Sequence, residues 1–124
     1  MIFKRNIDIE IRNDSSSLYV YALYKDYRVG RIACGIDEET KLITIGDITC
    51  KKNNKGYGSL MMAKLIEFAK MNDFQGINGW LSHVDMGHEE RLYHFYQKFG
   101  FEIVPNDDGL KVADIKLQLI INEQ

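Results

Sequence analysis

The first third of the chain alternates apolar and polar side chains with a period of two. Ile7, Ile9 and Ile11 are separated by charged residues, which indicates a strand with one face toward solvent. Turn-forming residues then separate two further apolar runs, and the pattern predicts strands at 18–24 and 27–36. No helical period fits before Lys41, so we expect an antiparallel meander in this part of the chain.

The middle of the chain changes from a strand to a helix. Leu42–Cys50 is rich in β-branched and apolar residues and is interpreted as a strand. After a turn that contains glycine, apolar residues recur at helical spacing up to about Asn72; they are Leu60, Met61, Leu65, Phe68 and Ala69. A further strand is expected at 77–84, parallel to Leu42–Cys50 because a helix connects the two.

The last third predicts a second helix and a hairpin. The helix is expected to begin near His88, with Asp85 as a candidate N-cap, and to end at Gly100. Its apolar stripe is Leu92, Phe95, Tyr96 and Phe99. Strands at 101–104 and 110–121 are expected around a turn at 105–109. The chain is therefore predicted to be one α/β (α+β) domain over residues 1–124, with a mostly antiparallel twisted sheet of about seven strands, a central parallel pair and two main helices.

Composition narrows the class of protein. The 124 residues carry a net charge of −2, which gives no basic surplus and argues against nucleic acid as a partner. No apolar run is long enough to span a membrane and no signal-peptide core is present, so we expect a cytoplasmic protein without a membrane partner. Cys34 and Cys50 fall in predicted strands and are expected to be buried, reduced thiols. The three histidines have no spacing that places two nitrogens on one helix face, so no metal site is expected.

The stretch 51–58 is a candidate anion site. Gly56 and Gly58 allow the backbone to approach a phosphate closely, and the start of the following helix presents unpaired N–H groups. Lys51, Lys52 and Lys55 raise the local positive potential. The known phosphate-loop and dinucleotide-binding patterns do not fit, and taken alone the stretch is equally well explained as a lysine-rich turn before a helix.

A second motif, at the end of the later helix, supports the anion site. Two glycines spaced Gly-x-Gly and a later Tyr-x-Lys-x-Gly-Phe together resemble the motifs of the GCN5-related N-acetyltransferase (GNAT) superfamily. The residues that match are Gly56, Gly58, Tyr96, Lys98, Gly100 and Phe101. Asn53 stands where this superfamily usually has Arg or Gln.

The resemblance implies an acetyl-CoA-dependent N-acetyltransferase in which the central parallel strands splay apart around the pantetheine arm. The residues implied to contact acetyl-CoA are Ile48, Thr49, Cys50, Asn53, Lys55, Gly56, Tyr57, Gly58 and Ser59. Backbone N–H groups near Ile48 and Thr49 are implied as donors to the oxyanion. Tyr96 has the position of the general acid that protonates the leaving thiolate; packing in the core is the alternative account of this residue.

The general base is left open, because the positions that often carry it in the superfamily fall on Leu42 and Thr44. A relaying water is one option, and the side chains that remain are Asp47, Ser82, His83 and Asp85. Of these, Asp85 and His83 are put forward as catalytic candidates.

The acceptor is expected to be a small-molecule or protein amine. The one or two helices that usually follow the first strand in this superfamily, and help to form the acceptor site, have no counterpart in the pattern here. This implies a minimal version with an open acceptor cleft or with a second subunit that completes it. A homodimer is expected because the last strand is long and apolar and its edge needs cover. The alternative function is a binding or interaction module of the same fold with weakened or lost transferase chemistry.

Overall fold

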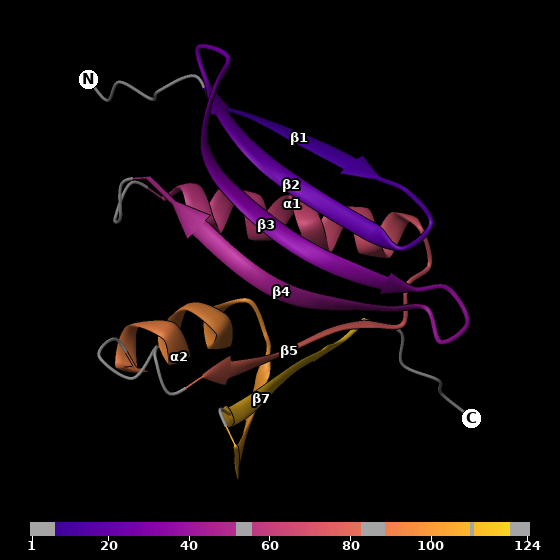
Figure 1. Ribbon diagram of the computed structural model, residues 1–124, viewed down its shortest axis with the longest axis vertical. Helices are drawn as coiled ribbons and strands as arrows, with labels where there is room; N and C mark the ends of the chain where they lie inside the picture. Colours follow the sequence, from indigo (N-terminus) through magenta and orange to yellow (C-terminus); the bar gives the residue numbers. More distant parts are fainter. Residues whose placement is uncertain (1–6, 52–55, 83–88, 110, 120–124) are drawn as a thin grey trace.

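The described residues form a single mixed sheet with two helices. The computed structural model describes residues 7–51, 56–82, 89–109 and 111–119. The elements in chain order are β1 (Ile7–Asn13), β2 (Ser17–Tyr24), β3 (Tyr27–Asp37), β4 (Leu42–Cys50), α1 (Tyr57–Met71), β5 (Gly76–Ser82), α2 (Glu89–Lys98), β6 (Glu102–Asp108) and β7 (Lys111–Gln118). The seven strands lie in the order β1-β2-β3-β4-β5-β7-β6 (Figure 1). The expected meander is confirmed, and residues 7–41 contain no helix.

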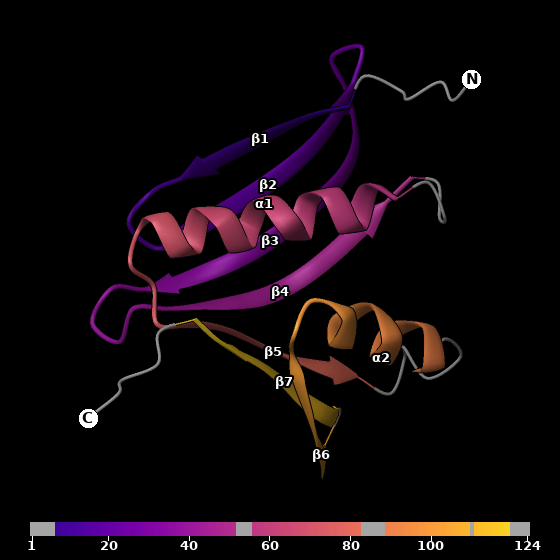
Figure 2. The ribbon, with the colours of Figure 1, turned by 180° about the vertical axis from the view of Figure 1, so that it is seen from behind.

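Helix α1 covers one face of β1–β4 and leaves the other face without a helix among the described residues (Figures 1 and 2). Its buried side chains are Tyr57, Met61, Met62, Leu65 and Ala69. They pack on fully buried strand residues such as Val20 and Ile32, and each such burial is worth about 1.5–3 kcal/mol. Leu60, expected on the buried side, is exposed, because the apolar stripe of the folded helix passes through Tyr57 and Met62.

The central parallel pair is paired at one end only. Three residue pairs join β4 to β5, namely Leu42–Gly76, Ile43–Ile77 and Thr44–Asn78. Beyond Thr44 the two strands separate, so the splay implied by the motif resemblance is confirmed. A bulge accompanies the separation: Cys34 of β3 pairs with Ile45 and Ala33 with Asp47, which leaves the intervening Gly46 without a partner on β3.

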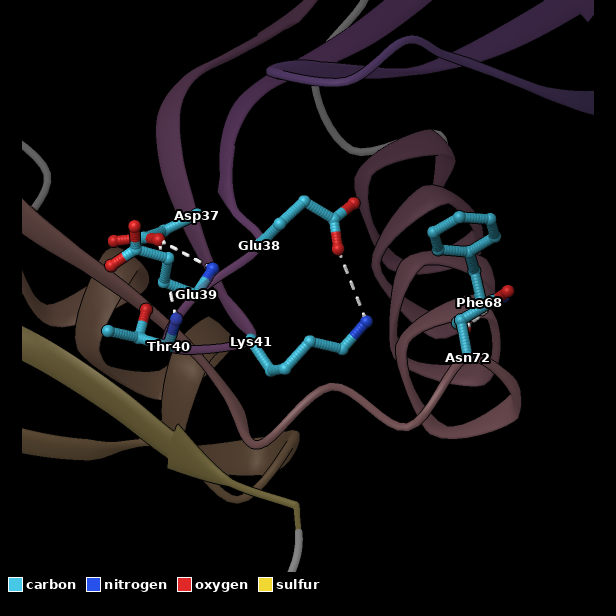
Figure 3. A network of polar contacts seen from close by, with 7 residues as sticks. All are labelled: Asp37, Glu38, Glu39, Thr40, Lys41, Phe68 and Asn72. Carbon is cyan, nitrogen blue, oxygen red and sulfur yellow. Dashed lines mark hydrogen bonds and ion pairs between the residues drawn. The ribbon is translucent and has the colours of Figure 1, made fainter.

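Local hydrogen bonds fasten the closed end of this fork. The Asp37 carboxylate accepts hydrogen bonds from the backbone N–H groups of Glu39 (3.0 Å) and Thr40 (3.3 Å), and so shapes the turn between β3 and β4 (Figure 3). The carbonyl of Lys41 then accepts a hydrogen bond of 2.7 Å from the N–H of Gln75, directly before β5. The turn thus holds the starts of β4 and β5 side by side while their other ends diverge.

The hairpin at the C-terminal end differs from the prediction. The turn expected at 105–109 is wrong for its first four residues, since β6 continues through Pro105 to Asp108. Proline is tolerated there because β6 is an edge strand, and the register shifts between Pro105 and Asp108. Strand β7 lies between β5 and β6, so the exposed edge on which the expectation of a dimer depended is paired. A homodimer stays a prediction, now without that argument.

Both cysteines lie in strands, as expected, but the prediction that both are buried holds only for Cys34. Cys34 is buried, and burial raises the pKa of its thiol to about 12. Cys50 is half-buried, and burial raises the pKa of its thiol as well. None of the described helices combines the length and the apolar character needed to cross a bilayer.

Candidate active site

A cavity of about 290 Å³ lies in the fork between β4 and β5, beside α2. Its lining comes from β4 (residues 45–48 and Cys50), from α1 (Gly58), from β5 (Trp80 and Leu81), from α2 (Arg91, Leu92, Phe95 and Tyr96) and from β7 (Ile115). The volume is at the lower end of the range for ligand pockets, about 300–1,000 Å³. It therefore suits a short acyl chain and its carrier arm better than a whole nucleotide.

The start of α1 opens toward this cavity. Gly56 is the N-cap, with a left-handed φ of 79°, and no side-chain hydrogen bond caps the helix within the described residues. The first N–H groups of a helix have no partner inside it and attract anions. Gly58 lines the cavity, and a Cβ atom added there would lie 3.5 Å from Cε1 of Phe95 on α2. The glycine turn thus brings bare backbone close to the cavity wall.

The end of α2 explains why the second motif has its spacing. The N–H of Phe101 donates to the carbonyl of Tyr96 at 3.1 Å, and the N–H of Gly100 donates to that of Gln97 at 2.9 Å. With Gly100 at φ 94°, these are the two hydrogen bonds of a Schellman motif. The apolar contact that accompanies such a cap is here the edge-to-face packing of Phe101 on Tyr96, with ring centroids 5.4 Å apart. Gly100 and Phe101 therefore fix the ring of Tyr96, which is 5% exposed, at the cavity wall.

Lys98 connects the two sequence motifs. Its Nζ donates a hydrogen bond of 2.8 Å to Oγ of Ser59 in the first turn of α1. The same ammonium lies 5.6 Å from the ring centroid of Phe95 and 5.3 Å from that of Phe99. The lysine of the second motif thus links the end of α2 to the start of α1.

The predicted site residues divide into three groups. Ile48, Cys50, Gly58 and Tyr96 line the cavity. Gly56, Tyr57 and Ser59 lie at the start of α1, with Tyr57 buried in the core, and Thr49 lines a different pocket, with Arg31. The remaining four predictions fall outside the described residues; they are Asn53, Lys55, His83 and Asp85.

Nine further residues line the cavity. Three of them, Gly46, Trp80 and Arg91, had no part in the sequence predictions of the site, and Asp47 was among the open candidates for the base. Gly46 had a signal, since a glycine inside a strand marks a bulge or a close approach. Arg91 had a weaker one, because a cation in the first turn of a helix is unfavourable to the helix dipole and so suggests another reason for its presence. Trp80, which is 45% exposed, could be placed at the cavity only once the separation of β4 and β5 was known, because in the sequence it has the pattern of an ordinary strand residue.

The fork, the bare helix start and the tyrosine at the cavity wall are together the features of an acyltransferase domain. Residues 3–101 match the model of the Acetyltransferase (GNAT) family, and the chain belongs to this family. The uncharacterized protein YocC of Bacillus subtilis (strain 168) is 35% identical over 66 residues, which are 53% of this chain and 39% of that protein.

Solved structures share the fold at low sequence identity. The ribosomal-protein-S18-alanine N-acetyltransferase of Escherichia coli matches with a TM-score of 0.73 and 11% identity, over 90% of this chain and 75% of that one. The PaiA N-acetyltransferase of Thermoplasma acidophilum, solved in complex with coenzyme A, matches with a TM-score of 0.69 and 15% identity, over 83% of this chain and 61% of that one. The chain thus spans less than two thirds of the length of some of its relatives.

Proposed function

We propose that this chain transfers an acetyl group from acetyl-CoA to an amine, by direct attack of the amine on the thioester. The observation that carries the proposal is that Gly58 of the glycine turn and Tyr96 of the second motif line one cavity in the fork between β4 and β5. Family membership and a neighbour solved with coenzyme A support the choice of donor. The diphosphate is assigned to the start of α1, with Asn53, Lys55 and residues 56–59.

The backbone of β4 is proposed to stabilise the oxyanion. In the described part of the chain, β4 has no ladder partner on β5 beyond Thr44, so N–H groups on this edge face the fork. Ile48 and Thr49 lie on this stretch, and the bulge at Gly46 re-aims the backbone before them. Loss of one such donor typically costs about 10²–10³ in kcat, which makes it one of the largest effects in the site.

Tyr96 is proposed as the general acid. The amine nitrogen bonds to the carbonyl carbon, the C–S bond breaks, and the Tyr96 hydroxyl gives its proton to the leaving sulfur. The proton that the amine loses goes to a base or to water. Asp47 is the cavity-lining carboxylate among the described residues and is a candidate base; Asp85 and His83 stay candidates.

Turnover of acetyl-CoA with a panel of amines tests the proposal, and the fluorescence of the single tryptophan, Trp80, reports donor binding at the cavity. We expect Tyr96→Phe to lower kcat by about 10²–10⁴-fold and to leave donor affinity unchanged. Tyr93→Phe, a half-buried tyrosine on the same helix, is the matched control. Full activity in Tyr96→Phe would overturn the role of Tyr96.

The same measurements distinguish the enzyme from the alternative function, a binding or interaction module of the same fold. Coenzyme A binding without turnover of any amine would favour an interaction module that has kept the donor pocket. Absence of any fluorescence or thermal response to coenzyme A would contradict the enzyme.

A further inference from the structure

A second pocket, of about 280 Å³, lies on the face of the sheet opposite α1. We call it the basic pocket and define it by Tyr21, Arg28, Arg31, Cys50 and Lys51. Tyr21 and Arg31 pair across β2 and β3, and their neighbours along the strands, such as Ala22 and Ile32, are buried beneath α1. Because side chains alternate along a strand, Tyr21 and Arg31 point to the face of the sheet opposite α1.

The aromatic floor of the basic pocket orients one of its cations. The guanidinium carbon of Arg28 lies 4.0 Å from the ring centroid of Tyr21. Tyr21 is only 8% exposed and stacks on Tyr19 with centroids 6.0 Å apart, so the ring is held in place. A guanidinium that stacks flat on a ring presents its N–H groups at its rim, where they can bind a carboxylate or phosphate in a bidentate manner.

The charges around the pocket leave it positive. Its lining holds three cations, Arg28, Arg31 and Lys51, and no carboxylate. Carboxylates also lie on the same face, and one of them is Asp8, which is opposite Leu23 in register. Asp47 is 3.5 Å from Arg31, and Glu10, opposite Tyr21 in register, is bound by Arg12 at 2.8 Å. Within the described residues no carboxylate is paired with Arg28 or Lys51, so the pocket has two cations for an incoming anion.

The basic pocket and the cavity in the fork are neighbours along β4. Cys50 lines both, and Asp47, the partner of Arg31, lines the cavity. Because Asp47 and Arg31 are 3.5 Å apart, an amine beside Asp47 and an anion beside Arg31 would belong to one short molecule. Resting on the proposed function, we propose that the acceptor is an amine that also carries a phosphate or carboxylate, and that Arg28, Arg31 and Lys51 bind this anionic group.

The anion has a second possible source, a phosphate of coenzyme A itself. The face of the sheet decides between them. The start of α1, where the donor's diphosphate is assigned, lies on the covered face, whereas Tyr21 and Arg31 lie on the opposite one. The acceptor must reach the thioester from the side that the donor does not occupy, and this assigns the basic pocket to the acceptor.

Paired probes test the inference: O-phosphoethanolamine against ethanolamine, and β-alanine against its amide. We expect the anionic member of a pair to be acetylated with at least a tenfold higher kcat/KM. Arg28→Gln, which leaves the Arg31–Asp47 pair in place, should raise the KM for the anionic amine by about tenfold with kcat retained. Arg12→Gln, on the same face but paired with Glu10, is the control and should change neither constant.

Two binding measurements distinguish the outcomes. Inorganic phosphate, compared with chloride at equal ionic strength, should raise the melting temperature of the wild type more than that of Arg28→Gln, because the start of α1 offers phosphate a further site in both proteins. Donor affinity, measured by Trp80 fluorescence, should be equal in both proteins for coenzyme A and for dephospho-coenzyme A. If Arg28→Gln lost affinity for coenzyme A but not for dephospho-coenzyme A, the pocket would bind a phosphate of the donor and the inference would be overturned.

Equal use of the charged and neutral amines, with no effect of phosphate, would overturn the inference while the proposed function stands. A phosphate response that is smaller in Arg28→Gln, in a protein that does not bind coenzyme A, would do the reverse: the anion pocket would stand and the proposed function would fail.

Discussion

Replacement of Gly58 by alanine should separate the packing of the glycine turn from its role in binding. Gly58 is the second residue of α1, and its new Cβ would lie 3.5 Å from Cε1 and 3.7 Å from Cζ of Phe95, which is ordinary van der Waals contact. Alanine in a helix is favoured over glycine by about 0.5–1 kcal/mol. We therefore expect the variant to be as stable as the wild type or more stable, by up to roughly 4 °C in melting temperature.

Ligand binding should change in the opposite direction. Coenzyme A at about 100 times its dissociation constant stabilises a protein by roughly 2.7 kcal/mol. The added methyl group occupies space between α1 and Phe95 at the cavity wall. If it weakens binding tenfold, the stabilisation at the same ligand concentration falls to about 1.4 kcal/mol, and if a hundredfold, to about 0.4 kcal/mol. Thermal unfolding with and without coenzyme A measures both quantities in one experiment.

Gly56→Ala is the matched control. Nothing lies within 4 Å of a Cβ at Gly56, but its φ of 79° is left-handed, so alanine there should cost about 1–2 kcal/mol through backbone strain alone. The two variants should thus shift the melting temperature in opposite directions. A destabilised Gly58→Ala would refute the packing argument. A stable Gly58→Ala with the full ligand shift would refute the idea that the donor needs bare backbone at this residue.

Three further predictions concern the scaffold. Gly76→Ala should destabilise the fold by more than about 2 kcal/mol in urea unfolding, because its Cβ would lie 2.6 Å from a backbone carbonyl oxygen of β7. In Gly30→Ala the clash, at 2.8 Å, is with the flexible end of Met61, so a smaller loss is expected, and equal losses would contradict this reasoning. Cys34, with its pKa raised to about 12, should react with a disulfide reagent at pH 8 only after unfolding; rapid labelling of the folded protein would disagree with its burial. Hydrogen bonds from the backbone N–H groups of two serines lower the pKa of Asp14. The stabilising effect of its carboxylate is therefore present above the pKa of the unfolded chain and is lost as the pH falls through the pKa of the folded protein. The difference in stability between wild type and Asp14→Ala should shrink below about pH 4.

Local patterns were sufficient for most of the architecture. Alternation in 7–36 and the helical period after Gly58 depend on neighbours in sequence, and the structure has strands and a helix there. The predicted turn at 105–109 was wrong for a reason that can be seen only in the complete sheet. Proline ends a central strand but not an edge strand, and the identity of the edge strand depends on the order in which all seven strands pair.

The candidate site was predictable where chemistry is carried by a motif. Gly58 and Tyr96 belong to such motifs and line the same cavity. Arg28 and Tyr21 had no motif, because their stacking depends on the register between β2 and β3 and on a bulge near Leu23 that no local pattern marks. Site residues that the pairing of strands brings together could therefore not be predicted from the sequence. Those that belong to a motif at a helix end could be.

The fork between β4 and β5 divides the fold into β1–β4 with α1 and β5–β7 with α2. In the sheet, three pairs of residues join the two parts, and the Lys98–Ser59 hydrogen bond joins their helices. Under the proposed function, the extended arm of the donor fills this division and contacts both parts. The donor then stabilises the fold as well as supplying the acetyl group. Each turnover would remove the donor from between the two parts, and the rigidity of the fold would rise and fall with the catalytic cycle.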